Sequence, residues 1–446
     1  MRSLKILAVF LLLSSSLTAQ DRYDEIIKRT QWFRNARFGM FIHFGAYSVP
    51  ARGEWLKSDE KMTTEQYQKF VDAFVPIDFD AKKWAKIAKQ AGMKYAVMGA
   101  KHHEGFCLWD SKLTDYKLSK QFGGRDIIRE FLDAFRAEGI KVGLYYSIID
   151  WHHPDYPNVG NHPQAGNAEW SKKTYNWDNY LKYMHGQIEE LVRDYGKLDI
   201  MWYDYSFDDY FGEKWKATEL LKMVRKYQPD IIIDNRLEGD GTAGSYSLKW
   251  GDFVTPEQSI PDESPKEAKG RVLPWETCLT TNNNWGFNQF DNQWKPAELL
   301  IQSLIRCVSM DGNFLLNIGP DPKGNIPEPC INILSQIGDW MQKNGESIYG
   351  CGSCTLPKQN WGCYTQKGNT IYAHWMYPFI GPINIKGINN KVKMVTLLST
   401  GVEPPNEKNW WGSKGNDNLF INFGKPIHCT FPLLDKASSV IKIEMK

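Results

Sequence analysis

The stretch LDIMWYDYSFDDY, residues 198–210, places two aspartates in a mostly apolar setting. Asp199 stands inside the apolar run, and Asp204 ends it between aromatic side chains. Burying a carboxylate without a partner is costly, so each one needs a structural partner or a chemical task. Asp199 opens the run and is predicted to be structural, whereas Asp204 closes it and is a candidate catalytic carboxylate. A helix N-cap is the alternative for Asp204, but the flanking aromatic residues make a poor helix start.

A second carboxyl group near Asp204 would suit the hydrolysis of a glycosidic bond. A glycosidase that retains configuration holds its nucleophile about 5 Å from another carboxyl group, which donates a proton. Three glutamates are candidates for this proton donor: Glu54 in RGEW, Glu257 in VTPEQ and Glu276 in PWETC. Residue types alone do not choose among them.

Other polar side chains also follow apolar runs. Adjacent residues of a strand point to opposite faces, so only one of each neighbouring pair can face a shared site. Each residue has a plain structural alternative, such as a core histidine, a packing tyrosine or an arginine paired with a structural carboxylate. The candidates are His43, His102, His103, Glu104, Tyr145, Tyr146 and Arg236.

The elements that must position these residues repeat one pattern from about residue 30 to 345. A short apolar run is followed by a polar or glycine-containing loop and then by an amphipathic helical stretch. Strands are predicted at 38–45, 94–102, 141–148, 198–204, 230–236, 274–279 and 313–320. Helices are predicted most clearly at 80–92, 126–139 and 177–195.

Nearly all-apolar strands separated by helices predict a parallel sheet. Seven units, with a degenerate eighth near 345–350, fit an α/β fold of the (β/α)8 TIM-like barrel type. An open doubly wound sheet is less favoured because no glycine-rich phosphate loop follows the first strand. Short alternating runs after residue 350 predict a C-terminal all-β sandwich. The expected organisation is therefore a catalytic barrel at 20–349 and a sandwich at 350–446.

The N-terminus has the composition of a secretory leader. Residues 1–19 combine Arg2 and Lys5, an apolar run too short for a bilayer, and small residues before a predicted cleavage after Ala19. We expect export to the periplasm or the exterior, without membrane insertion. Removing the leader leaves equal numbers of basic and acidic residues, which argues against nucleic acid or an anionic membrane as a partner.

Five of the eight cysteines lie late in the chain, from residue 330 onward. In an exported chain the CGSC pair fits half of a disulfide set, and a Cys-x-x-Cys pair can also bind zinc or carry electrons. Zinc needs a second ligand pair, for which His374 and His428 are only loosely placed, so no metal is predicted. The five late cysteines are Cys330, Cys351, Cys354, Cys363 and Cys429.

Several motifs occur in a consistent order between about residues 25 and 350: FGMFIHFGAYSVPARGEW, AKHHEGFCLWDS, VGLYYSIIDW, LDIMWYD, IDNR, WETC followed by NNNWGFN, and GNFLLNIGPDPKGNIP. Together they resemble family 29 of the glycoside hydrolases, the α-L-fucosidases. The resemblance implies a catalytic barrel with a C-terminal β-sandwich and no cofactor. It also implies exo-cleavage of terminal α-L-fucose with retention of configuration.

The resemblance also implies roles for individual residues. It places the nucleophile at Asp204, and the DFVTPEQ segment selects Glu257 as the acid/base, with Glu276 as the fallback. Phe287 matches an aromatic residue near the methyl group of fucose, where a 6-deoxy sugar needs an apolar wall. The other residues that match sugar-contacting motifs are His43, Glu54, Trp55, His102, His103, Tyr146 and Arg236.

The expected partners are therefore fucosylated glycans, while linkage preference and oligomeric state are not readable. Two alternatives stay open. One is a non-catalytic sugar-binding barrel, which would lack a nucleophile or an acid. The other is a barrel glycosidase that acts on a related sugar, such as a galactoside.

Overall fold

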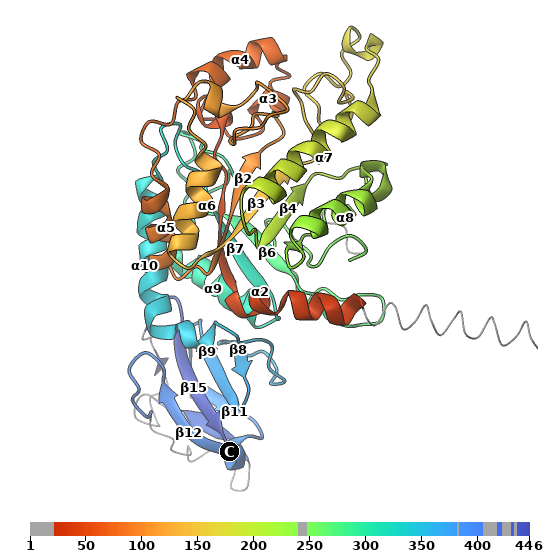
Figure 1. Ribbon diagram of the computed structural model, residues 1–446. Coiled ribbons are helices and arrows are strands. Elements are labelled where there is room, and N and C mark those ends of the chain that lie inside the picture. Colours follow the sequence, from red (N-terminus) through yellow and green to blue (C-terminus); the bar gives the residue numbers. More distant parts are fainter. Residues whose placement is uncertain (1–21, 240–247, 381–382, 405–416, 422–429, 432–434) are drawn as a thin grey trace, which may run out of the picture.

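A computed structural model describes residues 22–239, 248–380, 383–404, 417–421, 430–431 and 435–446 (Figure 1). The predicted leader at 1–19 lies outside the described residues, as do His428 and Cys429. Within the described ranges, no helix combines the length and apolarity that crossing a membrane requires.

A curled parallel sheet of seven strands forms the centre of the larger domain, and all seven predicted strands are present. The strands follow the order β5-β4-β3-β2-β1-β7-β6, and each neighbouring pair is parallel. Their residues are almost entirely buried, as expected for strands covered on both faces. They are β1 (Phe38–Ile42), β2 (Tyr95–Lys101), β3 (Lys141–Ser147), β4 (Ile200–Asp204), β5 (Ile232–Ile233), β6 (Glu276–Thr280) and β7 (Asn313–Ile318).

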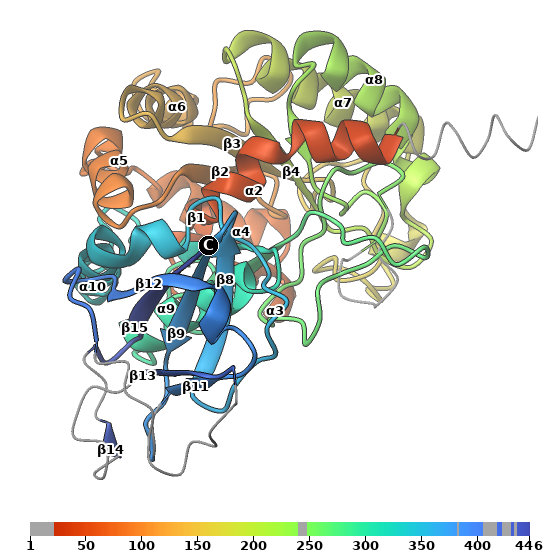
Figure 2. The same ribbon diagram turned by 90° about the horizontal axis from the view of Figure 1, so that it is seen from below.

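Helices cover the outer face of this sheet, as Figure 2 shows for α5 to α8. The three clearest predicted helices are confirmed, and side-chain caps begin them at the expected places. Asp80 caps α5, Asp126 caps α6 and Asn176 caps α7, each accepting a backbone N–H of the first turn. The helices are α2 (Gln31–Ala36), α3 (Leu56–Asp59), α4 (Thr64–Ala73), α5 (Ala81–Gln90), α6 (Ile127–Ala137), α7 (Trp177–Asp194), α8 (Ala217–Tyr227), α9 (Ala297–Val308) and α10 (Glu328–Asn344).

The concave side of the sheet encloses a separate, aromatic-rich core. Alternate strand residues point inward, and the inner cluster includes Phe41, Tyr95, Tyr145 and Trp202. Their rings pack directly on one another, with Phe41 and Trp202 centred 5.2 Å apart. Aromatic residues make up 14% of the chain, and part of them therefore fill the inside of the sheet, beneath its carboxyl ends.

The predicted eighth strand near 345–350 is wrong, because Gly345–Ser347 forms a 3-10 helix. A different segment lies between the two edge strands. Isolated parallel bridges join this segment to both edges of the sheet. Phe253 pairs with Asp234, just after β5. Val254 pairs with Trp275 and Glu257 pairs with Cys278, at β6. Proline at 256 and the short run of bridges explain why this segment does not have the pattern of a regular strand.

The C-terminal region is built from antiparallel sheets, as predicted. Four strands pair in the order β12-β15-β9-β8, while β11–β13 and β10–β14 form two smaller two-stranded sheets. Figure 1 shows this region at the end of the molecule opposite α3 and α4. The strands are β8 (Gly362–Lys367), β9 (Thr370–Trp375), β10 (Phe379–Ile380), β11 (Ile383–Ile385), β12 (Val392–Leu397), β13 (Leu419–Ile421), β14 (Thr430–Phe431) and β15 (Ser439–Met445).

Candidate active site

A cavity of about 380 Å³ opens at the carboxyl ends of the parallel strands. This volume lies in the lower part of the range of small-molecule sites, roughly 300–1,000 Å³. Strand ends and the loops that follow them supply its walls. The residues on these walls that bear titratable or aromatic groups include His43, Trp55, His102, His103, Tyr145, Trp202, Asp204, Tyr205, Phe207, Arg236, Glu257 and Trp285.

Asp204 is the last residue of β4 and points into the cavity. The hydroxyl of Tyr145 donates a hydrogen bond of 2.7 Å to its Oδ2, and Arg236 Nη1 donates one of 3.0 Å to its Oδ1. His103 Nε2 lies 3.8 Å from Oδ2. Burial raises the pKa of Asp204, while the Arg236 guanidinium and the Tyr145 hydroxyl oppose that rise. The carboxylate is thus held in a fixed orientation at the floor of the cavity.

Asp199 has the structural role that its position predicts. It lies before the start of β4, where its Oδ1 accepts from Lys141 Nζ at 2.8 Å and its Oδ2 from the backbone N–H of Val142 at 3.0 Å. The two aspartates of the apolar run therefore serve opposite ends of the same strand.

Arg236 joins the two candidate catalytic carboxylates. Its Nη1 binds Asp204, and its Nη2 donates a 2.7 Å hydrogen bond to Glu257 Oε2. Burial alone would lower the pKa of Arg236, but the carboxylates of Glu257 and Asp204 raise it. The guanidinium also lies 4.6 Å from the ring centre of Trp202 and bonds Thr255. The candidate nucleophile and the candidate acid/base therefore face the same cavity, and one guanidinium binds both carboxylates.

Three neutral imidazoles form a polar wall of the cavity. Burial lowers the pKa of His43 to about 3 and that of His102 to about 4, and it also lowers the pKa of His103. His43 Nδ1 lies 2.7 Å from Asn317 Oδ1, and His103 Nδ1 lies 2.7 Å from Ser147 Oγ. One nitrogen of each of these two rings is thus engaged, which orients the other nitrogen for hydroxyl groups of a ligand.

Both His102 and His103 line the cavity, although strand alternation predicts that only one could. β2 ends at Lys101, so the two histidines lie beyond the strand and escape its alternation. Their ring centres are 4.1 Å apart.

Tyr146 is a correction to the predicted substrate-binding set. It is fully buried, and its hydroxyl donates to Gln187 Oε1 of α7 at 2.7 Å, on the helix-covered side of the sheet. Its neighbour Tyr145 takes the inward position and reaches Asp204. The register of β3 decides which of the two adjacent tyrosines faces the cavity, and the sequence of the pair does not reveal that register.

The WGFN segment contributes through Trp285, which lines the cavity with its ring centre 5.0 Å from that of His43. Phe287 is not among the described residues that line the cavity, so its predicted place near the sugar is not reproduced. Glu54 supports this segment, because its Oε2 accepts the backbone N–H of Gly286 at 2.8 Å. Burial raises the pKa of Glu54 to about 7.

Glu276 lies in the inner core rather than on the walls of the cavity. Tyr95 Oη donates to its Oε2 at 2.6 Å, and Trp202 Nε1 donates to its Oε1 at 3.1 Å. The carboxyl group is completely buried, and burial raises its pKa to about 7. It therefore fixes the Trp202 ring on which Arg236 rests.

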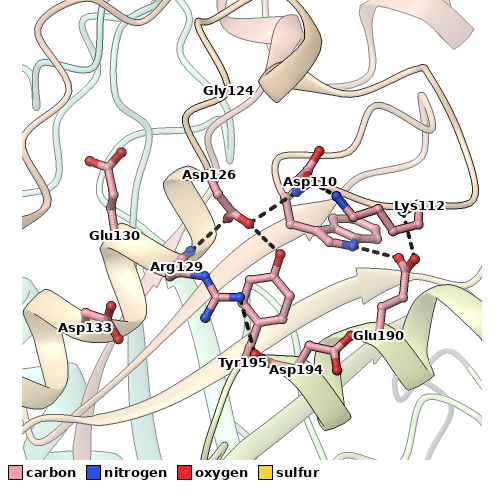
Figure 3. A pocket seen from close by; sticks show the side chains of 11 residues that line it. Asp110, Lys112, Gly124, Asp126, Arg129, Glu130, Asp133, Glu190, Asp194 and Tyr195 are labelled. Atoms are coloured by element: carbon pink, nitrogen blue, oxygen red, sulfur yellow. Dashed lines mark hydrogen bonds and ion pairs between the residues drawn. The ribbon is translucent and has the colours of Figure 1, made fainter.

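A second pocket, of about 540 Å³, lies between α6 and α7 outside the sheet (Figure 3). Its carboxylates bind neighbouring groups of the protein. Glu190 accepts from Trp109 Nε1 and from the backbone N–H of Lys112, and Asp126 accepts from Tyr195 Oη at 2.5 Å. Among the described residues, no cluster of three or more histidine, cysteine or acidic side chains has the arrangement of a metal site. The seven described cysteines are free thiols.

A curled parallel sheet with two carboxylates facing one cavity at the carboxyl ends of its strands is typical of the class of glycoside hydrolases. Comparisons with known proteins define the family. The family model for alpha-L-fucosidase matches residues 14–346. The chain belongs to the alpha-L-fucosidase family.

Relatives span nearly the whole chain. An alpha-L-fucosidase of Dictyostelium discoideum is 31% identical over 429 residues, covering 88% of this chain and 89% of its own. The tissue alpha-L-fucosidase of Homo sapiens is 30% identical over 424 residues, covering 88% and 84%.

Solved structures show the same similarity. Alpha-L-fucosidase isoenzyme 1 from Paenibacillus thiaminolyticus is 48% identical, with a TM-score of 0.90 over 94% of this chain and 99% of that chain. A family 29 alpha-L-fucosidase from Bacteroides thetaiotaomicron, 30% identical with a TM-score of 0.79, was trapped as a covalent intermediate with 2-fluoro-fucosyl fluoride. The match covers 94% of this chain and 96% of that chain.

Proposed function

We propose that this protein is an exo-acting, retaining α-L-fucosidase that releases terminal α-L-fucose from fucosylated glycans. The observation that carries the proposal is the Arg236 bridge between Asp204 and Glu257 in one cavity. Retention requires a nucleophile and an acid/base close together, and this arrangement supplies both. Family membership supports the choice of sugar.

In the first step, Asp204 attacks the anomeric carbon of fucose while Glu257 protonates the leaving oxygen, giving a covalent fucosyl-enzyme. Tyr145 and Arg236 orient the attacking carboxylate. In the second step, Glu257 takes a proton from water, which attacks the anomeric carbon and releases fucose and Asp204.

The surroundings of the two glutamates favour Glu257 as the acid/base. Glu257 lines the cavity and is partly exposed, with 30% of its side-chain surface accessible. Glu276 is enclosed by Tyr95 and Trp202, so it has no path to a leaving oxygen without breaking both hydrogen bonds. Glu276 is therefore assigned a supporting role beneath Trp202.

The neutral histidines suit recognition of the sugar hydroxyls, and Trp55 and Trp285 supply apolar surface beside them. We assign His43, Trp55, His102, His103 and Arg236 to the fucose site. Glu54 acts by holding the Trp285 segment. We assign Phe287 an indirect role in the site, because its carbonyl accepts the backbone N–H of Gly53, next to Glu54.

Three broader features belong to the same proposal. Segment 253–257 closes the parallel sheet into a (β/α)8-type barrel, supported by its bridges to both edges. The C-terminal sheets pack as a sandwich around their own apolar core, which includes Trp375 and Ile441. The basic and apolar pattern of residues 1–19 directs the chain to the periplasm or the exterior.

A panel of chromogenic glycosides tests the activity, together with fucose release from α1,2-, α1,3-, α1,4- and α1,6-linked oligosaccharides. We expect fucosides to be cleaved and the matching galactosides to be cleaved far more slowly. Faster cleavage of galactosides would reassign the sugar. Binding of fucose without cleavage of any substrate would identify a non-catalytic sugar-binding protein.

A further inference from the structure

The turn that follows Asp204 has a strained backbone. Tyr205 has a φ of +82°, a value that a bulky side chain rarely adopts, and Asp208 has a φ of +44°. Such strain persists only where the surroundings enforce it, and it gathers at functional sites. An aromatic residue in this conformation, directly after the candidate nucleophile, therefore calls for a functional explanation.

The surrounding residues hold this turn firmly. Phe207 and Tyr210 exchange two backbone hydrogen bonds of 3.2 and 2.7 Å. Trp215 Nε1 also donates to Ser206 Oγ at 3.1 Å. The turn is thus a preorganised element, which lowers the entropic cost of binding a ligand.

Aromatic rings from this turn form one wall of the cavity. The ring of Tyr205 lies 5.5 Å from that of Trp55 and 5.7 Å from that of Phe207, and all three residues line the cavity. Asn161 Nδ2 donates to the Tyr205 hydroxyl. The backbone of Gly160 packs so closely on Phe207 that a Cβ there would lie 2.6 Å from the ring. Loop residues around 160 therefore fix both rings in place.

Tyr205 borders the fucose site, with its ring centre 5.1 Å from that of His103, and Phe207 continues the wall from Tyr205 toward Tyr210, whose ring centre is 5.1 Å away. Asp204 and Tyr145 belong to strands, whereas Tyr205 and Phe207 follow the end of β4. A terminal fucose fills the floor, where Asp204 attacks it, so the group attached to fucose must lie beyond that floor. Flat aromatic faces suit the apolar faces of a pyranose ring.

We propose that Tyr205 and Phe207 form the platform for the leaving group and select substrates in which fucose is linked to another pyranose. This inference rests on the proposed function and extends it from the sugar that is released to the sugar that carries it. Figure 1 shows the C-terminal sheets at the opposite end of the molecule from α3, which follows Trp55. The loops of the larger domain therefore build this specificity.

The test compares two substrates in the Phe207→Ala variant. Fucosyl fluoride has a leaving group of one atom, which cannot reach the platform, whereas a fucosyl disaccharide must use it. We expect the ratio of kcat/KM for the best disaccharide to kcat/KM for fucosyl fluoride to fall about tenfold. Phe207→Trp, which keeps a flat aromatic ring at this position, should retain the wild-type ratio. Phe211→Ala is the matched control, because Phe211 is 49% exposed and lies four residues further on.

An unchanged ratio in Phe207→Ala would overturn the proposal, and so would an equal fall in Phe211→Ala. A binding measurement separates this failure from failure of the proposed function. In the Asp204→Asn background, Phe207→Ala should weaken binding of the disaccharide about tenfold relative to free fucose, as measured by calorimetry. If the wild-type protein cleaved no fucoside, the proposed function would fail, yet the binding ratio would still decide whether the platform exists.

Discussion

The hydroxyl of Tyr145 donates a 2.7 Å hydrogen bond to Oδ2 of Asp204. Tyr145 lies on β3 and Asp204 ends β4, and the register of these strands places Ser147, two residues beyond Tyr145, opposite Asp204. The inward face of β3 therefore supplies the partner that orients the carboxylate. The same contact helps to keep Asp204 ionised in a buried setting, because a hydrogen bond to the charged form favours it.

The adjacent tyrosines provide a matched pair of substitutions. Tyr145→Phe should lower kcat about 10- to 100-fold, because it removes a hydrogen bond to a charged group. Tyr146→Phe should leave kcat within about threefold and lower the free energy of unfolding by about 1 kcal/mol, because its hydroxyl bonds Gln187 on the helix-covered side of the sheet. Steady-state kinetics and urea unfolding measure the two effects. A larger loss of kcat in Tyr146→Phe would restore Tyr146 to the substrate site.

Replacing the acid/base should depend on the leaving group. Glu257→Ala should lower kcat/KM about 100- to 10,000-fold for glycans, and far less for an aryl fucoside whose leaving group needs no protonation. Added azide should restore turnover of the aryl fucoside by replacing water in the second step. Glu276→Ala is the control, and azide should not rescue it. If azide rescued only Glu276→Ala, Glu276 would be the acid/base and Glu257 would have the supporting role.

Arg236 should set the acidic limb of the pH profile. Asp204 must be ionised to attack, and the guanidinium of Arg236 opposes the burial that raises its pKa. Arg236→Gln should therefore move the acidic limb of kcat/KM to higher pH. Arg29→Gln removes a comparable ion pair, to Asp252, outside the cavity and should leave the limb in place. An acidic limb that stays fixed in Arg236→Gln would show that another group controls it.

Glu276 should make stability depend on pH. Its pKa rises from 4.5 to about 7 on burial, so the folded protein keeps a proton that the unfolded chain releases. The resulting stability is complete below pH 4.5 and is lost as pH rises through about 7, an effect of about 3 kcal/mol. Glu276→Gln should remove this part of the pH dependence in urea unfolding. Glu263→Gln, at an 83% exposed side chain, is the control, and equal slopes in both variants would contradict the prediction.

Much of the fold was predictable because apolar strands and capped helices are local signals. The seven strands and three clearest helices follow from runs of buried residues and from capping residues such as Asp80 and Asp126. The segment 253–257 was not recognised, because it holds its place through isolated bridges rather than a regular ladder. Long-range pairing of this kind leaves little trace in a local pattern.

The candidate site was predictable where a residue ends a strand, as with Asp204, or follows one within three residues, as with His43 and Arg236. It was less predictable where register or the path of a loop decides the outcome. The alternation rule could not choose between Tyr145 and Tyr146, and it failed for His102 and His103 because β2 ends before them. Asn317 was missed, although a polar residue inside the apolar run NFLLNIGP was a usable signal for the partner of His43.

Covalent trapping tests the central assignment, that Asp204 is the nucleophile. The protein would be incubated with 2-fluoro-fucosyl fluoride, digested and analysed by mass spectrometry. We expect one 2-fluoro-fucosyl adduct, on the peptide that contains Asp204, no adduct in Asp204→Asn, and a fall in kcat of at least about 1,000-fold in that variant. An adduct on any other residue, or full labelling of Asp204→Asn, would contradict the account.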